Sequence, residues 1–206
     1  MNRQIRLYWA FAVLLLILGC GPKVMVPPEI DLNEYGNVGL IDFSSEAKGN
    51  LGEFVTQKFL EEVSSSQKGA RIMELGSLDN VLEAVQRDRM DPEAIQAIGK
   101  KYNVNAIITG NLKVSEVKPK VKLSSIIQSM SVKAEVAASL TVRLLETEQG
   151  ATVWTNSAQD TETVAQVSIF SGGGALFDAD DPEKAYGDLA RSLVKKITSD
   201  FKESYK

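Results

Sequence analysis

The clearest hydrophobic pattern in the chain is a two-residue alternation between residues 132 and 144. Apolar side chains alternate there with mostly polar ones, so one side of an extended segment is apolar. A β-strand places successive side chains on opposite faces, so the pattern predicts a long strand with one buried face. A turn at Glu148–Gly150 and an extended segment around Thr152–Asp160 predict its partner strand. The apolar positions are Val132, Ala134, Val136, Ala138, Leu140, Val142 and Leu144.

Three other apolar runs predict further strands. They lie at residues 38–43, 70–75 and 104–114. The first is apolar at nearly every position up to Asp42, which is typical of a buried strand. The third carries apolar residues and a glycine on one side, as a strand against a core would. The chain therefore offers about five strands to one sheet.

Apolar residues at helical spacing predict four helices, at about 51–63, at about 78–88, from 92 to about 102, and after residue 182. Each is preceded by a residue type that caps helix N-termini. In the last two helices a proline occupies the first helical position and a glutamate follows it near the positive end of the helix dipole. The predicted caps are Asn50 with Glu53 in a box-like arrangement, Ser77, Asp91 and Asp181.

These elements predict an α+β fold, with a mixed sheet of about five strands and helices packed on one face. The length of 206 residues fits one domain with a sizeable core. We place this single domain at residues 37–206. Residues 20–36 precede it as a short tether that contains three prolines.

The first nineteen residues are typical of a secretory signal peptide. Arg3 and Arg6 precede the apolar run Leu7–Leu18, which is shorter than the roughly 20 residues that span a bilayer. The segment Ile17–Cys20 resembles the bacterial lipobox, although Leu18 is bulkier than most lipoboxes carry there. In a lipobox the signal is cut before the cysteine, which receives a diacylglycerol on its sulfur and an N-acyl chain. The alternative is an ordinary signal peptide with an incidental cysteine.

Lipidation at Cys20 would determine where the domain works. Each buried methylene contributes about 0.8 kcal/mol, and two or more acyl chains hold a protein stably at a membrane. Removal of residues 1–19 also removes two arginines, so the net charge changes from −4 to −6. Cys20 is the only cysteine, which excludes a disulfide within one chain. The tether Gly21–Tyr35 reaches at most about 50 Å at ~3.3 Å per residue.

The composition argues against several classes of function. There is no histidine, which removes the commonest general base and the commonest zinc ligand. The acidic balance without a basic patch argues against nucleic acid. The run Ser171–Gly174 lacks the lysine of a phosphate-binding loop, and the acids around Asp178–Glu183 lack the spacing of a calcium loop. We expect no enzyme, no metal and no cofactor besides the acyl chains on Cys20.

Several strings, in order, resemble one family. Val38–Phe43 ends in Asp-Phe as the family's opening strand does, and Leu78–Glu83 is similar to its LDEVL helix. Ala94–Gly110 is the most specific match, a helix followed by a strand that ends in ITG. Gly150–Trp154 is similar to a TGEVLW hairpin. Following a lipobox, these strings resemble the CsgG-like and LpoB-like family of bacterial envelope lipoproteins, whose fold is related to the anticodon-binding domain and the N-terminal domain of TolB.

The resemblance implies a fold and a location but no active site, since none of these strings is catalytic. It implies a non-enzymatic accessory or scaffold protein in envelope assembly or secretion, whose partner is an unidentified envelope protein or a second copy of itself. Gly21 stands where lipoproteins kept at the inner membrane carry Asp, which implies the periplasmic face of the outer membrane. The family leaves two alternatives: an oligomeric outer-membrane secretion channel, and an activator of peptidoglycan synthases. The short tether argues against the activator's geometry.

Two segments, 117–131 and 164–177, do not fit the simple domain. In the family's secretion channel, hairpins inserted at these places span the membrane, and a spanning hairpin needs about 20 residues plus a turn. Both segments are shorter than that, and we expect no return strand after the glycines of the second. Either the segments cover the core, or they expose an apolar surface to a partner or a second copy. The candidate contact residues are Ile126, Ile127, Met130, Val167, Ile169 and Phe170.

Overall fold

The computed structural model describes residues 24–120, 133–165, 167–169 and 175–205. The chain divides into two compact units, residues 29–202 and the two ends of the chain. In the second unit, β1 (Met25–Val26) pairs antiparallel with β11 (Ser204–Tyr205). No helix in the described part of the chain is long and apolar enough to cross a membrane.

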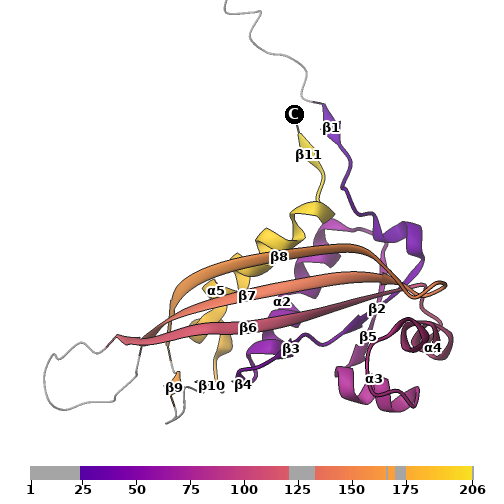
Figure 1. Ribbon diagram of the computed structural model, residues 1–206. Helices are drawn as coiled ribbons and strands as arrows, with labels where there is room; N and C mark the ends of the chain where they lie inside the picture. The colour runs from indigo at the N-terminus through magenta and orange to yellow at the C-terminus, as the bar shows by residue number, and fades with distance from the viewer. Residues whose placement is uncertain (1–23, 121–132, 166, 170–174, 206) are drawn as a thin grey trace, which may run out of the picture. The chain divides into compact units, whose positions relative to one another are not determined.

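The larger unit is built on a mixed sheet with the strand order β5-β2-β6-β7-β8 (Figure 1). The first three strands are parallel, and β6, β7 and β8 are antiparallel neighbours. The short β3 (Ser44–Ser45) also pairs with β6. This confirms the α+β class and the mixed sheet. The bounds are Asn37–Ile41 for β2, Arg71–Gly76 for β5, Ala106–Lys120 for β6, Lys133–Glu146 for β7 and Ala151–Val164 for β8.

Two of the three long strands, β6 and β8, extend well beyond the residues that the hydrophobic pattern predicts. β6 continues to Lys120, where it pairs with Lys133, and β8 continues to Val164, where it pairs with Ala134. The predicted ends, near residues 114 and 160, mark only where the simple alternation stops. Strand pairing continues on both sides to the first residues of β7, although the register of the β6 ladder shifts between Val114 and Glu116.

The main core lies between one face of the sheet and two helices, α2 (Leu51–Ser66) and α5 (Pro182–Ile197). Figure 1 shows both helices on the far side of the three long strands. The alternating apolar positions of β7 all point into this core, as predicted. Phe43, Phe59 and Phe201 meet edge to face there, with ring centroids 5.2 and 6.1 Å apart. Aromatic rings prefer this arrangement because the positive edge of one faces the negative face of the other.

A second, smaller core lies on the opposite face, under α3 (Leu78–Ala84) and α4 (Pro92–Tyr102). Ile107 of β6 and Leu145 of β7 pair in register and belong to this core, whereas their neighbours Ile108 and Leu144 belong to the main core. The predicted arrangement, with helices on one face, therefore holds for the β7–β8 part of the sheet. At β2 and β6 both faces are covered, because the connections before and after β5 pass on opposite sides.

Three of the four predicted helix caps are confirmed. The side chains of Ser77, Asp91 and Asp181 each accept a hydrogen bond from a backbone N–H in the first helical turn. Asn50 makes no such cap bond, and its Oδ1 instead accepts from the hydroxyl of Tyr186. The second helix is shorter than the predicted range of about 78–88. It ends at Ala84 because Gln86 adopts a left-handed conformation, with φ of 56°.

The expectation of no return strand after the glycines of the segment 164–177 is wrong, because a short strand follows them. β9 (Ser168–Ile169) pairs antiparallel with β10 (Ala175–Phe177), which also pairs in parallel with β4 (Lys48–Gly49). The expectation rested on the length that a membrane span needs. Two or three residues suffice for a hairpin beside a core, and Phe177 is fully buried in that core.

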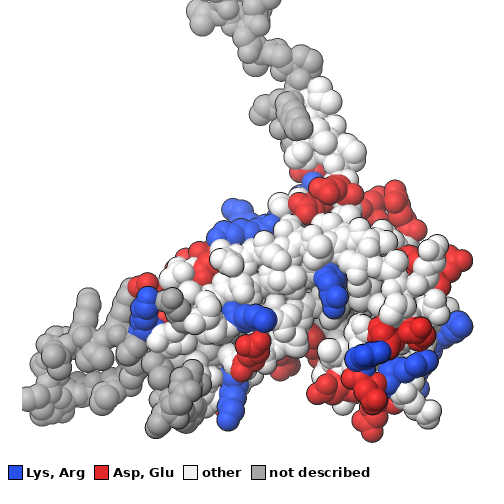
Figure 2. Space-filling model, viewed as in Figure 1, with Lys and Arg blue, Asp and Glu red and all other residues white. Residues whose placement is uncertain are grey.

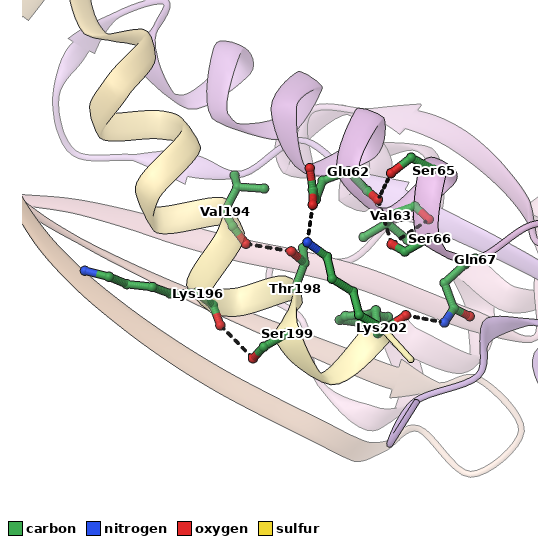
Figure 3. Close-up of polar contacts among 11 residues, drawn as sticks. Glu62, Val63, Ser65, Ser66, Gln67, Val194, Lys196, Thr198, Ser199 and Lys202 are labelled. Atoms are coloured by element: carbon green, nitrogen blue, oxygen red, sulfur yellow. Dashed lines mark hydrogen bonds and ion pairs between the residues drawn. The ribbon is translucent and has the colours of Figure 1, made fainter. Parts of the chain in front are cut away.

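A buried glutamine joins the ends of the larger unit. Gln67 accepts from the N–H of Leu32 over 2.8 Å and donates from Nε2 to the carbonyls of Ile30 and Phe201, at 3.1 and 2.7 Å. Leu32 and Phe201 lie in the 3₁₀ helices η1 (Leu32–Tyr35) and η2 (Thr198–Phe201). Figure 3 shows this corner, where the last turns of α2 and α5 meet and Lys202 reaches Glu62. One side chain thereby fixes both segments that lead out of the unit.

Candidate partner-binding surface

Most of the residues predicted to contact a partner lie outside the described residues. These are Ile126, Ile127, Met130 and Phe170, as well as the lipidation candidate Cys20. Val167 is 3% exposed and packs in the main core, so its side chain is not on the surface. The backbone of Ile169 lies in β9, opposite Ala175. The surface that the described residues do offer is a different one.

That surface is the face of β6, β7 and β8 that no helix of the described residues covers. Because paired residues of neighbouring strands share a face, the register assigns its members row by row. Most of its side chains carry hydroxyl or amide groups, and all are half-buried or exposed. Figure 2 shows this side of the molecule as largely uncharged, with isolated cations. We call it the polar face; its residues are Asn111, Lys113, Ser139, Thr141, Arg143, Thr155, Ser157 and Gln159.

Side-chain hydrogen bonds in the middle row of the polar face join β7 to β8 and β6 to β3. The hydroxyls of Thr141 and Ser157 lie 2.9 Å apart, and Asn111 donates from Nδ2 to Oγ of Ser44 over 2.9 Å. That hydroxyl in turn donates to the carbonyl of Gly110 over 3.2 Å. Neighbouring strands therefore present these polar groups in fixed positions, and a partner would meet an ordered surface.

The rows on either side each carry one cation. Arg143 lies between Thr109 and Thr155 in the register and is exposed. Lys113 lies beside Ser139, and its Nζ is 3.5 Å from a carboxylate oxygen of Glu46. Both partners of that ion pair are more than half exposed, so the pair contributes little to stability. Donors and acceptors on one surface suit hydrogen bonds to a polar partner surface.

A hollow of about 340 Å³ lies beside α4 and the turn between β7 and β8. Its polar groups already bond one another. Thr147 donates to the carbonyl of Val104 over 2.8 Å, and Gln96 donates to the carbonyl of Glu148 over 3.1 Å. The carboxylate of Glu146 accepts from the backbone N–H of Gln149 over 3.1 Å. These contacts fasten the turn, and they account for the polar lining of the hollow.

Two groups with raised pKa values lie away from the polar face. Burial raises the pKa of Asp42, at the end of β2, and the carboxylates of Glu53 and Glu74 raise it further. Burial raises the pKa of Tyr186 to about 12, with smaller contributions from Asp178 and Glu53. In the described part of the chain, no three Cys, Asp or Glu side chains form a group that could hold a metal ion.

No protein-family model matches the chain, and no curated protein matches its sequence. Solved structures with a similar chain path include the PelC dodecamer from Paraburkholderia phytofirmans, at 14% identity and TM-score 0.47, covering 89% of this chain and 98% of that one. Lipoprotein GNA1162 from Neisseria meningitidis matches at 16% identity and TM-score 0.36, covering 62% and 83%. The LpoB C-terminal domain from Escherichia coli matches at 9% identity and TM-score 0.36, covering 62% and 83%. We carry no function over from likenesses this weak.

In the sequence, the polar face corresponds to the polar positions of the alternation, which do not by themselves indicate a binding site. The alternation in β7 places Ser139, Thr141 and Arg143 on the side opposite the core. The apolar residues outside the regular pattern instead predict a contact surface in the segments 117–131 and 164–177, because exposed apolar patches often mark contact surfaces. The polar side of β7 also indicates a face of the sheet that is open to solvent.

Proposed function

We propose that this chain is a non-enzymatic, lipid-anchored protein of the bacterial envelope that binds a protein partner at the periplasmic face of the outer membrane. The observation that carries the proposal is the segment that ends at Cys20, with two arginines and an apolar run ahead of it. Acylation there would keep the domain within the reach of a short tether from the membrane.

The polar face supports the second half of the proposal. Its three strands give an ordered, uncovered surface on the side of the sheet away from α2 and α5. Interfaces formed by folded partners use about one hydrogen bond per 100–200 Å², which hydroxyl and amide side chains readily supply. A partner in the envelope would bind this face while the opposite side of the sheet stays covered by its helices.

Metabolic labelling tests the anchor. Cells that express the wild-type chain and grow with labelled palmitate should yield labelled protein, and globomycin should block its processing. The Cys20→Ala variant should take no label. A labelled Cys20→Ala protein, or an unlabelled wild-type protein that is expressed and stable, would show that the anchor assignment is wrong.

Photo-crosslinking in cells tests the partner surface. A crosslinking amino acid at Thr155, on the polar face, should give one dominant product with a second envelope protein. The same amino acid at Lys195, on the exposed side of α5, is the matched control and should not give that product. Equal products from both positions, or none from Thr155, would contradict a binding role for the polar face.

One observation favours the secretion channel as a second candidate. The ladder between β6 and β7 continues to Lys120 and Lys133, so two paired strands lead directly into residues 121–132. Imaging of the detergent-purified chain by negative stain separates the two proposals. Rings would favour the channel, whereas single domains would favour the accessory role.

A further inference from the structure

The outer edge of β8 is the last position in the sheet order of the described residues. An unpaired strand edge exposes a row of N–H and C=O groups, which a strand of another molecule can join. Proteins commonly protect such edges with proline or lysine. β8 contains no Pro, Lys or Arg over its length, Ala151–Val164. Its protection, if it has one, must come from elsewhere.

Three hydrogen bonds show how this edge is occupied. The N–H of Ser157 donates to Oδ1 of Asn156 over 2.8 Å, and the N–H of Thr161 donates to Oδ1 of Asp160 over 2.9 Å. Between them, the carbonyl of Gln159 accepts from Nζ of Lys196 over 2.8 Å. Backbone groups of alternate residues in an antiparallel strand point to the same side. These three groups therefore point away from β7, toward the free edge, and side chains already bind them.

The side chains that bind the edge are themselves held by the C-terminal helical segment. Oδ2 of Asp160 lies 3.0 Å from Nζ of Lys196 and accepts from the hydroxyl of Ser192, one turn earlier on α5. Asn156 donates from Nδ2 to the carboxylate of Asp200 over 3.0 Å. The hydrogen bond from Ser192, together with those from Lys196 and Thr161, lowers the pKa of Asp160, so this carboxylate is ionised at neutral pH. The edge contacts are thus a fixed network.

We propose that Asn156, Asp160 and Lys196 form a latch that closes the edge of β8 against strand addition by a second copy of this chain. A second copy fits because β8 can pair antiparallel with itself, centred on Gln159, without opposing two like charges. In that register Asp160 faces Ala158 and Glu162 faces Asn156, and these two acids are the only charged residues of β8. The latch leaves the polar face open and concerns only the edge beside it.

Opening the latch should make the chain associate with itself. We expect the full chain with Asp160→Ala and Lys196→Ala, purified in detergent, to have about twice the protein mass of the wild type, because two particles join through their β8 edges. The matched control is Lys195→Ala, which removes the neighbouring exposed lysine and should leave the mass unchanged. Light scattering coupled to size exclusion measures both.

A proline identifies the edge as the point of contact. The N–H of Gln159 points away from β7, so Gln159→Pro removes no hydrogen bond of the existing ladder but blocks a strand added outside it. Added to the double variant, Gln159→Pro should return the mass to the wild-type value. A double variant that stays at the wild-type mass with a native circular dichroism spectrum would overturn the proposal. So would a mass increase that survives the proline.

Hydrogen exchange tests the latch without relying on the double variant to fold. In Asp160→Ala alone, the amide of Thr161 loses its carboxylate partner and should exchange about tenfold faster or more. The amide of an interior ladder residue such as Ala158 should exchange as in the wild type. An unchanged rate at Thr161 would show that the carboxylate does not occupy the edge.

Discussion

The ring of Phe43 lies directly over Gly110, so closely that a Cβ atom at Gly110 would come within 2.7 Å of the ring atom Cδ1. Phe43 follows β2, and Gly110 lies in β6, next to the residue that pairs with β3. The missing side chain lets the ring enter the main core, where it packs edge to face on Phe59. This contact holds the chain in place between the end of β2 and the start of β3.

Gly110→Ala should therefore destabilise the fold. The added methyl group must displace the Phe43 ring, which is 3% exposed and has little room to move. We expect a loss of about 1–3 kcal/mol in the free energy of unfolding, the usual range for an overpacked core. Urea unfolding measures it, with Ser139→Ala on the polar face as a control that should change by less than about 0.5 kcal/mol. Equal values for the two variants would contradict the close contact.

Gln67→Ala should also destabilise the larger unit. It leaves the N–H of Leu32 and the carbonyls of Ile30 and Phe201 without this partner in a buried place. A buried group left unsatisfied costs about 1–3 kcal/mol, so we expect a loss of about 2–4 kcal/mol in urea unfolding. The control is Ser65→Ala, whose hydroxyl bonds the carbonyl of Glu62 on the exposed side of α2. If Gln67→Ala unfolds at the wild-type urea concentration, the glutamine does not hold the two segments.

The contributions of Asp42 and Asp160 to the stability of the fold should change with pH in opposite directions. The pKa of Asp42 is raised in the folded chain from its usual 3.8, so the folded state binds this proton more tightly and ionisation lowers stability as pH rises through the raised pKa. Asp42→Asn should therefore stabilise the chain at pH 7 and have little effect at pH 3. The pKa of Asp160 is lowered, so its contribution is present above 3.8 and is lost as pH falls through the folded pKa.

Thermal unfolding at several pH values measures both effects. Asp160→Asn serves as the contrast, because it should destabilise the chain at pH 7 and lose that effect in acid. Two variants that shift the melting temperature in the same direction at pH 7 would be inconsistent with the burial of Asp42 or with the hydrogen bonds to Asp160.

Arg143→Glu should weaken partner binding without unfolding the domain. Arg143 is exposed on β7, the central strand of the polar face, and surface substitutions of this kind change stability by about 0.5 kcal/mol or less. Reversal of one of the few charges on this face should reduce the crosslinking yield at Thr155. Lys195→Glu, on α5, is the matched control and should leave the yield unchanged. A yield that Arg143→Glu does not alter would place the partner elsewhere.

The regular pattern of the sequence predicted the parts of the fold that depend on local chemistry. The alternation from Ala134 to Leu144 gave β7 its buried face, and Asp91 and Asp181 gave their helix starts. What the sequence did not predict depends on contacts between distant segments. Asn50 makes no cap bond to α2, and its side-chain oxygen instead accepts from the hydroxyl of Tyr186, far along the chain.

The same limit applies to the surfaces. The polar face exists only when three strands are in register. The latch on β8 needs Lys196, which lies on a helix much later in the chain than β8. A pattern along one segment shows which side of it is buried. It does not show which side another segment will cover. Coverage by α4 creates the second core, and the lack of such coverage leaves the polar face beside it open among the described residues.

The pairing of β1 with β11 has a practical consequence for anyone who handles the protein. Met25 and Val26, in the tether, pair with Tyr205 and Ser204, one or two residues before the last residue. The segments that contain β1 and β11 are therefore held together as one strand pair. A purification tag or reporter fused close behind β11 would disturb the pairing that holds the tether, so labels belong at an internal surface position instead.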